Sequence, residues 1–505
     1  MIGRRRRQVV AGALLATAVL ATAFSAGACS SDDGGPRASR STSTTATSST
    51  TTPTAVASPT VPDGSEDDTL TGVGDPYYPE AGNGGYDVSR YDVTVRATIG
   101  GVDQITSQAS ITARATTELD RFSLDLIGLT VDRATVDGRD ATVERQGDEL
   151  VVVPDRPIAD GDRFTTVIDY HGSPGAARGP DSGLDEGGWV EAADYSVVVA
   201  EPVGASTWLP SNDHPSDKAT FSITATVDAP LEAVSNGRLI RRTDEGATST
   251  FRWEAVEPMS TYLMTLAIGD YDLVPGAAGD LPILDAVPAG TNAPPANPFL
   301  RFPEMIGFFG ERFGPYPFSI AGNISVPGLE PLALECQTRA VHSAAILAGR
   351  SRDVVIAHEL AHQWFGDAVS PDQWDDIWLN EGFATYAEWL WEAHDGGPTV
   401  EQSARQNHDD PDLATALAVP PANPGKAELF GPSVYQRGAM FLVELSKRMG
   451  EDRLLELLRR WVDDHRTGNA DTDDFLALAH EVANQDLSDL SQPWLYGSTL
   501  PPLSF

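Results

Sequence analysis

Cysteine is nearly missing from this chain. Only Cys29 and Cys336 occur in 505 residues. Cys29 lies in an N-terminal segment of different character from the rest, so the folded part retains one thiol and no intrachain disulfide can stabilise it. Stability must come from packing. A hydrophobic content of 41% and this length leave room for two domains with a large core.

Basic residues are also scarce. The chain has 35 Lys and Arg against 73 Asp and Glu, a formal net charge of -38. Residues 1–72 contain six Arg and six acidic residues, so the whole excess lies on the remainder. Such a surface repels nucleic acid and anionic lipid, which excludes both as partners of the folded part. The simplest interpretation is a solubilising surface. The alternative is a surface that concentrates cationic peptides near a cleft.

Large apolar side chains are almost missing from residues 30–75, which consist mainly of Ser, Thr, Pro and Ala. Such a composition cannot bury enough surface to offset the entropy of ordering. We therefore predict a disordered tether over 30–75. Its composition would also suit O-glycosylation.

Residues 1–29 have the pattern of an export segment. Arg4 to Arg7 form a positive start, the span from Val9 to Ala28 is apolar and uncharged, and Cys29 precedes a serine-rich run. The pattern resembles a bacterial lipoprotein signal, which implies that Cys29 is lipidated and begins the mature chain. Two alternatives remain: a retained membrane anchor, since the apolar span is long enough, and twin-arginine export. All three predict a location outside the cytoplasm, secreted or attached to the membrane.

The remaining sequence changes its hydrophobic period once. Up to about residue 272 apolar residues alternate or run between Gly, Asp and Pro turns, which predicts β-strands. Candidate strands are Tyr91–Val95, Phe122–Leu126, Leu150–Val153, Phe164–Ile168 and Phe221–Ala225. From about Leu273 the period is helical. Candidate helical segments are Ala344–Gly366, Asn380–Ala393, Ser433–Met449 and Asp452–Asp464. We predict a multidomain α+β protein, with an all-β domain over 76–272 and a mainly helical domain over 273–505.

The helical part contains the sequence HELAH at residues 358–362. No Pro or Gly interrupts the run before Gly366, so His358 and His362 are expected one turn apart on one helix face. Glu381 follows inside WLNEGFA. Two imidazoles and a carboxylate suit Zn²⁺ and leave a fourth position open for water, and Glu359 is placed to take a proton from that water. The alternative is a pair of surface histidines on a solvated helix, which does not explain the placement of Glu381.

These motifs stand in a longer pattern. HELAHQWFGD at 358–367 and WDDIWLNEGFATY at 374–386 are preceded by WLPSNDHPSDKA at 208–219, VSNG at 234–237 and FGPYPF at 313–318. From about Tyr86 onward the chain resembles the zinc aminopeptidases of the aminopeptidase N type, a group that includes leukotriene hydrolase. The resemblance implies a saddle-like β-domain followed by a thermolysin-like catalytic domain with one Zn²⁺ per chain. No repeat of 20 to 50 residues occurs near the C-terminus, so the helical-repeat domain of many relatives is expected to be absent.

The resemblance also implies roles for three further residues. Glu335, in LALEC at 332–336, matches the family glutamate that holds the substrate's ammonium group, and Glu201 is the best match for a second such carboxylate. Tyr435, in YQRGA, matches the tyrosine that stabilises the oxyanion. The structural alternatives are an edge-strand glutamate for Glu335, a turn glutamate for Glu201 and a core tyrosine for Tyr435.

The expected function is hydrolysis of the N-terminal residue from peptides with a free N-terminus. Two alternatives stay open. The same zinc would serve an endopeptidase or an epoxide hydrolase, and the same fold would serve an inactive surface-binding lipoprotein. The sequence predicts neither the oligomeric state nor the preferred N-terminal residue.

Overall fold

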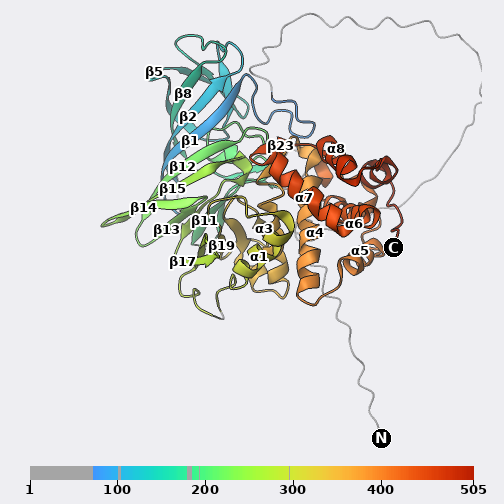
Figure 1. Ribbon diagram of the computed structural model, residues 1–505. Helices are drawn as coiled ribbons and strands as arrows, with labels where there is room; N and C mark the ends of the chain where they lie inside the picture. The colour runs from blue at the N-terminus through green and yellow to red at the C-terminus, as the bar shows by residue number, and fades with distance from the viewer. Residues whose placement is uncertain (1–71, 101–103, 179–184, 193, 295) are drawn as a thin grey trace, which may run out of the picture.

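A computed structural model describes residues 72–100, 104–178, 185–192, 194–294 and 296–505. The chain builds a β-rich part first and a helical part second, and the two lie against each other (Figure 1). This order confirms the predicted fold class. The predicted export segment, Cys29 and the tether up to residue 71 lie outside the described residues.

The β-rich part is organised around an eight-stranded sheet with the order β14-β15-β12-β1-β2-β8-β4-β5. The strands are β1 (Tyr86–Ala97), β2 (Ile105–Ala115), β4 (Thr130–Val136), β5 (Arg139–Asp140), β8 (Arg163–Gly172), β12 (Ala219–Asp228), β14 (Arg238–Glu245) and β15 (Thr248–Met259). All pairs are antiparallel except β1 with β12. In β1 the side chains of Tyr91, Val93 and Val95 are buried while the residues between them are more exposed, as period-two alternation requires.

Two smaller sheets complete this part. One has the order β13-β16-β11-β10-β9 and the other the order β3-β7-β6. Their strands are β3 (Phe122–Asp125), β6 (Thr142–Gln146), β7 (Glu149–Val153), β9 (Ala176–Arg178), β10 (Asp185–Ala192), β11 (Tyr195–Val199), β13 (Glu232–Ser235) and β16 (Leu266–Gly269). Strand β11 ends two residues before Glu201, so this sheet positions that glutamate.

The helical period does not begin at Leu273, and that expectation is wrong. Strands β17 and β18 come before the first helix, and they belong to a five-stranded sheet with the order β17-β18-β19-β21-β20. Its strands are β17 (Tyr271–Ala278), β18 (Leu281–Pro288), β19 (Asn323–Val326), β20 (Ala333–Leu334) and β21 (Ala340–Ser343). β17 and β18 form a hairpin, with Gly279 in the left-handed conformation between them. The other edge of β18 pairs in parallel with β19, so these strands belong to the second part of the chain.

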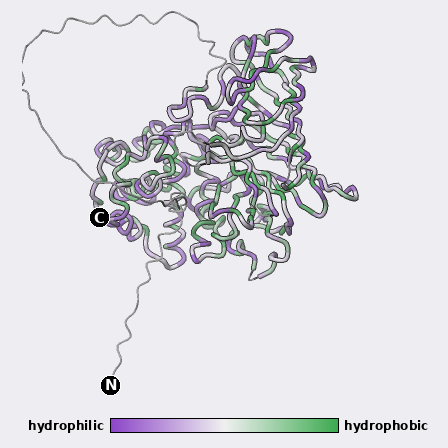
Figure 2. Tube along the Cα trace, turned by 180° about the vertical axis from the view of Figure 1, so that it is seen from behind, coloured by the Kyte–Doolittle hydropathy of each residue, from purple (hydrophilic) through white to green (hydrophobic). Residues whose placement is uncertain are grey.

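Helices dominate from Phe302 onward. The described helices are α1 (Phe302–Phe313), α2 (Ala344–Leu347), α3 (Arg352–His362), α4 (Trp378–His394), α5 (Val400–His408), α6 (Gly438–Met449), α7 (Glu451–His465), α8 (Thr472–Ala483) and α9 (Ser488–Ser491). The segment Ala344–Gly366 is therefore not one helix. A turn in which the Gly349 amide donates to the Ile346 carbonyl separates α2 from α3. Figure 2 shows hydrophilic segments along the outer loops and helices, with hydrophobic segments between them.

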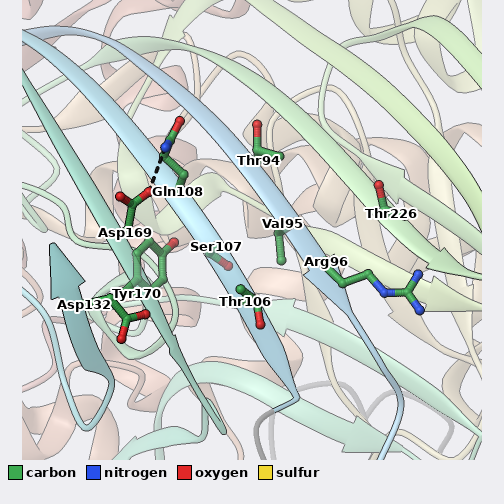
Figure 3. A pocket seen from close by; sticks show the side chains of 10 residues that line it. All are labelled: Thr94, Val95, Arg96, Thr106, Ser107, Gln108, Asp132, Asp169, Tyr170 and Thr226. Atoms are coloured by element: carbon green, nitrogen blue, oxygen red, sulfur yellow. Dashed lines mark hydrogen bonds between the residues drawn. The ribbon is translucent and has the colours of Figure 1, made fainter.

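A hollow lies on the eight-stranded sheet (Figure 3). Polar side chains from β1, β2, β8 and β12 dominate its lining, among them Arg96, Gln108 and Asp169, and Gln108 donates to Asp169 at 2.7 Å. None of the residues predicted for catalysis lines it. No helix in the described part of the chain is long and apolar enough to cross a membrane.

Candidate active site

Helix α3 presents the two histidines of the HELAH motif on one face, as their spacing predicts. The rings of His358 and His362 lie 4.8 Å apart, centroid to centroid. His362 is buried and His358 is 12% exposed at its side chain. The C-terminal end of α3 therefore offers two imidazoles to one small region.

Glu381 enters this region from the first turn of α4. Its Oε2 lies 3.2 Å from Nε2 of His358 and 3.5 Å from Nε2 of His362. Burial raises the pKa of Glu381, but His362 and His358 outweigh it and lower that pKa to about 2. A carboxylate with this pKa is ionised at neutral pH, which is the form that binds a metal.

These three groups fit Zn²⁺. Their ligand atoms all lie within 4.8 Å of one another. Tetrahedral ligands at about 2.0–2.1 Å from a zinc ion are separated by roughly 3.3 Å, close to the two distances from Glu381. Imidazole nitrogen and carboxylate oxygen are also the donors of catalytic zinc sites. The structure thus brings together all three predicted ligands.

Both histidines are oriented by a second contact that sequence reasoning missed. Nδ1 of His358 lies 3.3 Å from Oε2 of Glu388, and Nδ1 of His362 lies 3.1 Å from the Phe365 carbonyl oxygen. An acceptor at Nδ1 fixes the tautomer that leaves Nε2 free for a metal. Glu388 follows Glu381 by seven residues, two turns along the same face of α4, and that spacing was the available signal.

Replacing Glu388 with Ala is expected to weaken zinc binding by about 10- to 100-fold, because His358 loses the partner that orients it. Competition with a chelating dye measures this affinity. Glu392→Ala is the matched control, since Glu392 lies one turn further along α4 and is half-buried. If Glu388→Ala binds zinc as tightly as the control does, the orienting role is wrong.

Glu359 lies next to His358 on α3 and is buried. Its carboxylate, together with Glu335 and His362, forms a second group of ligand-type atoms within 4.8 Å of one another. Burial raises the pKa of Glu359 to about 8, with the two histidines opposing the shift and Glu335 and Glu381 adding to it. A buried carboxyl group beside a metal site, with a pKa near neutrality, is suited to accept and return a proton.

Tyr435 lies in a π-helical turn, Ser433–Arg437, immediately before α6. Its ring stacks against the imidazole of His358, with centroids 6.0 Å apart and planes 19° apart. Burial, with a smaller effect from Glu381 and other carboxylates, holds the pKa of Tyr435 well above its usual value. The phenol therefore stays protonated and able to donate a hydrogen bond.

Two glycines let α4 lie close to the start of α6, directly after the π-helical turn. A Cβ atom on Gly382 would meet the backbone of Gly438 at 3.0 Å, and a Cβ atom on Gly438 would meet the Gly382 Cα at the same distance. Arg437 anchors the turn from the other side by donating to the carbonyls of Leu417, Val419, Pro493, Trp494 and Gly497. Its charge is thus used for structure rather than directed toward the metal site.

Glu335 and Glu201 meet beside the three metal ligands. Glu335 follows β20, Glu201 follows β11, and both place ligand-type oxygens within 4.8 Å of one another and of Glu381. Oε1 of each is buried without a hydrogen-bond partner among the described residues. Burial raises the pKa of both carboxyl groups, and Glu381 adds to the shift in each. Buried acceptors of this kind are favourable when a cation contacts them.

Comparisons with known proteins support this geometry. Residues 88–263 match the model of the peptidase M1 N-terminal domain, and residues 303–494 match that of the peptidase family M1 domain. A mutant M1 zinc metallopeptidase from Deinococcus radiodurans, solved with a Tyr-Ser-Ala substrate, is 30% identical. It aligns with 86% of this chain and 99% of its own, with a TM-score of 0.79.

The curated relatives are longer than this chain. Probable aminopeptidase 1 of Sulfurisphaera tokodaii is 26% identical over 397 residues, covering 74% of this chain and 49% of that protein. Tricorn protease-interacting factor F2 of Thermoplasma acidophilum is 24% identical over 415 residues, covering 76% and 50%. The chain spans about half the length of these two relatives. Both M1 domains occur here in order, and the Deinococcus structure matches nearly end to end; the chain therefore belongs to peptidase family M1, whose cofactor here is a single zinc ion.

Proposed function

We propose that the protein is an aminopeptidase that removes the N-terminal residue from peptides. The observation that carries this proposal is the pair of carboxyl groups of Glu201 and Glu335, each with a buried, unpaired oxygen beside Glu381. An α-ammonium group is the cation that an exopeptidase must recognise, and carboxylates in a partly dry pocket bind it strongly. The relatives named aminopeptidases support the same activity.

The proposed roles follow from the positions of the side chains. Zn²⁺, when held by His358, His362 and Glu381, supplies a Lewis acid that polarises the scissile carbonyl and makes water more acidic. Glu359 takes the proton from the attacking water and returns it to the leaving amine. Tyr435 donates a hydrogen bond to the oxyanion that develops on the substrate carbonyl.

Glu335 and Glu201 hold the ammonium group at the end of the pocket. The carbonyl that reaches the metal side is therefore that of the first residue. Cleavage after the first residue follows from this geometry. The same carboxylates would repel the carbonyl of a blocked N-terminus, which has no positive charge.

A panel of aminoacyl fluorogenic amides, assayed beside N-acetylated controls with and without a chelator, tests the proposal. We expect chelator-sensitive cleavage of the free amines and a ratio of free to acetylated kcat/KM of about 100 or more, as for the loss of a buried charged contact. Equal rates on acetylated substrates would indicate an endopeptidase instead. Absence of zinc at stoichiometric level and of any turnover would indicate an inactive binding protein.

We also propose that the protein is located outside the cytoplasm. The N-terminal pattern supports export and attachment to the membrane through a lipid on Cys29, which lies outside the described residues. Mass spectrometry of the mature N-terminus tests it. A chain that begins at Cys29 with an added lipid mass is expected, and an unmodified Cys29 contradicts the lipid anchor.

A further inference from the structure

The loop that carries Glu335 is held in an unfavourable backbone conformation. It joins β20 to β21 and turns back sharply, with the Arg339 amide donating to the Cys336 carbonyl at 2.8 Å. Within the turn Thr338 has φ of 67°, in the left-handed region. That region is costly for a β-branched residue, and such conformations persist only where the surrounding structure enforces them.

The β-domain supplies one set of contacts to this loop. The Asn236 side chain donates to the Gln337 carbonyl at 2.8 Å, and the Gly237 amide donates to the Thr338 hydroxyl at 2.8 Å. Arg339 donates back to the Ser235 and Gly237 carbonyls. These bonds tie the loop to the β-domain.

The metal helix supplies the other set through one side chain, Gln363. Its Nε2 donates to the Glu335 carbonyl at 2.9 Å. Its Oε1 accepts from the Thr338 amide at 2.7 Å and from the Tyr316 hydroxyl at 3.0 Å. Gln363 is 3% exposed and directly follows His362. One amide group therefore links the end of α3 to the backbone of the residue that is proposed to hold the substrate's ammonium group.

The chemistry of the contact requires an amide. A backbone carbonyl at one end needs a donor and a backbone N–H at the other end needs an acceptor, so the orientation of the Gln363 amide is determined by its partners. A carboxylate would keep the acceptor but place an oxygen against the Glu335 carbonyl. An apolar side chain of the same length would leave all three partners unpaired.

We propose that Gln363 is a positioning residue that sets the separation between Glu335 and the metal ligands. This inference rests on the proposed aminopeptidase function. In that reaction a single Cα separates the ammonium group from the scissile carbonyl, so both groups must be held to within a fraction of an ångström. Misplacement by about 1 Å lowers rates by up to about 100-fold. Gln363 thus determines whether a substrate that is held by its N-terminus places its first carbonyl at the metal ligands.

The test compares Gln363→Leu and Gln363→Glu with Tyr316→Phe. The first removes all contacts of the amide, and the second loses the donor to the Glu335 carbonyl while keeping acceptor atoms for Thr338 and Tyr316. Tyr316→Phe is the control, because it removes one donor and leaves the links to Glu335 and Thr338. We expect kcat/KM on free-amine substrates to fall about 10- to 100-fold in both Gln363 variants, and the ratio of free to acetylated activity to fall with it. In the control both values stay within about threefold of wild type, as the rest of the link remains.

Binding measurements separate positioning from general damage. In a zinc-loaded Glu359→Gln background, Gln363→Leu is expected to weaken binding of an unblocked tripeptide but not of its acetylated form, with zinc affinity unchanged. The inference is overturned if a folded Gln363→Leu variant keeps the wild-type ratio of free to acetylated activity. It is also overturned if the variant loses zinc affinity while that ratio is retained. If Gln363→Leu does not fold, Gln363→Glu decides by the same criteria. If wild type itself does not prefer free amines, the proposed function fails instead, and the panel above shows this independently.

Discussion

Glu359→Gln is expected to lower kcat by about 1,000-fold or more, within the range that loss of a positioned acid–base group produces. The side chain keeps its size, so α3 and the three proposed ligands are left intact. The amide cannot take a proton from water, and it cannot return one to the leaving amine. Because Glu359 is proposed to serve both steps, no other residue replaces it.

Steady-state kinetics and metal analysis together check this result. Zinc content is expected to stay at one ion per chain, and an unblocked peptide is expected to bind without being cleaved. Glu392→Gln, a change of the same kind on α4, serves as the control and should turn over normally. Substantial residual activity in Glu359→Gln would refute the assignment of Glu359 as the base.

The second large effect is expected for Glu335→Gln. Loss of one charged partner of a buried ammonium group costs about 3 kcal/mol, or roughly 100-fold in kcat/KM. The loss is confined to substrates with a free N-terminus, because acetylated substrates carry no charge for Glu335 to bind. The ratio of free to acetylated activity should therefore collapse in this variant.

Measuring both substrates in one assay distinguishes recognition from damage. A uniform loss on free and acetylated substrates would mean that Glu335 supports the structure of the site rather than the ammonium group. Glu201→Gln gives the companion result. A change in the same direction is expected there, because the Glu201 carboxylate lies in the same group of oxygens.

The sequence placed the two proposed histidine ligands together for a local reason. His358 and His362 are four residues apart on one helix, so helical geometry alone brings them together. The α+β fold class could be predicted because the apolar residues change from a β-strand period to a helical period once along the chain. Zinc as the cofactor followed from the donor types, and the family comparison confirms it.

Contacts between distant segments could not be predicted in the same way. Glu388 reaches His358 only because α3 and α4 pack at a particular offset, and Gln363 reaches Glu335 only because β20 ends beside α3. The contact of Gln363 with Glu335 has no sequence period, and the spacing of Glu388 from Glu381 places Glu388 on the correct face of α4 without showing which histidine it meets. The strands β17 and β18 were missed because burial does not alternate along either of them. The expected change at Leu273 therefore came about thirty residues too early, α1 beginning at Phe302.

The roles of Tyr435, Glu335 and Glu201 stay predictions that the geometry favours. Tyr435 stacks on a proposed metal ligand, and the two glutamates converge beside Glu381 from different domains. These arrangements favour the proposed roles over the alternatives of a core tyrosine, an edge-strand glutamate and a turn glutamate.

X-ray absorption at the zinc edge reports the ligands of the bound ion in solution, and so tests whether His358, His362 and Glu381 hold it. We expect one zinc per chain with nitrogen and oxygen neighbours at about 2.0–2.1 Å and outer-shell scattering from two imidazoles. The Glu381→Ala variant should lose one oxygen neighbour or the ion itself. A sulfur neighbour at about 2.3 Å, a single imidazole, or no bound zinc would show that these three residues are not the ligands.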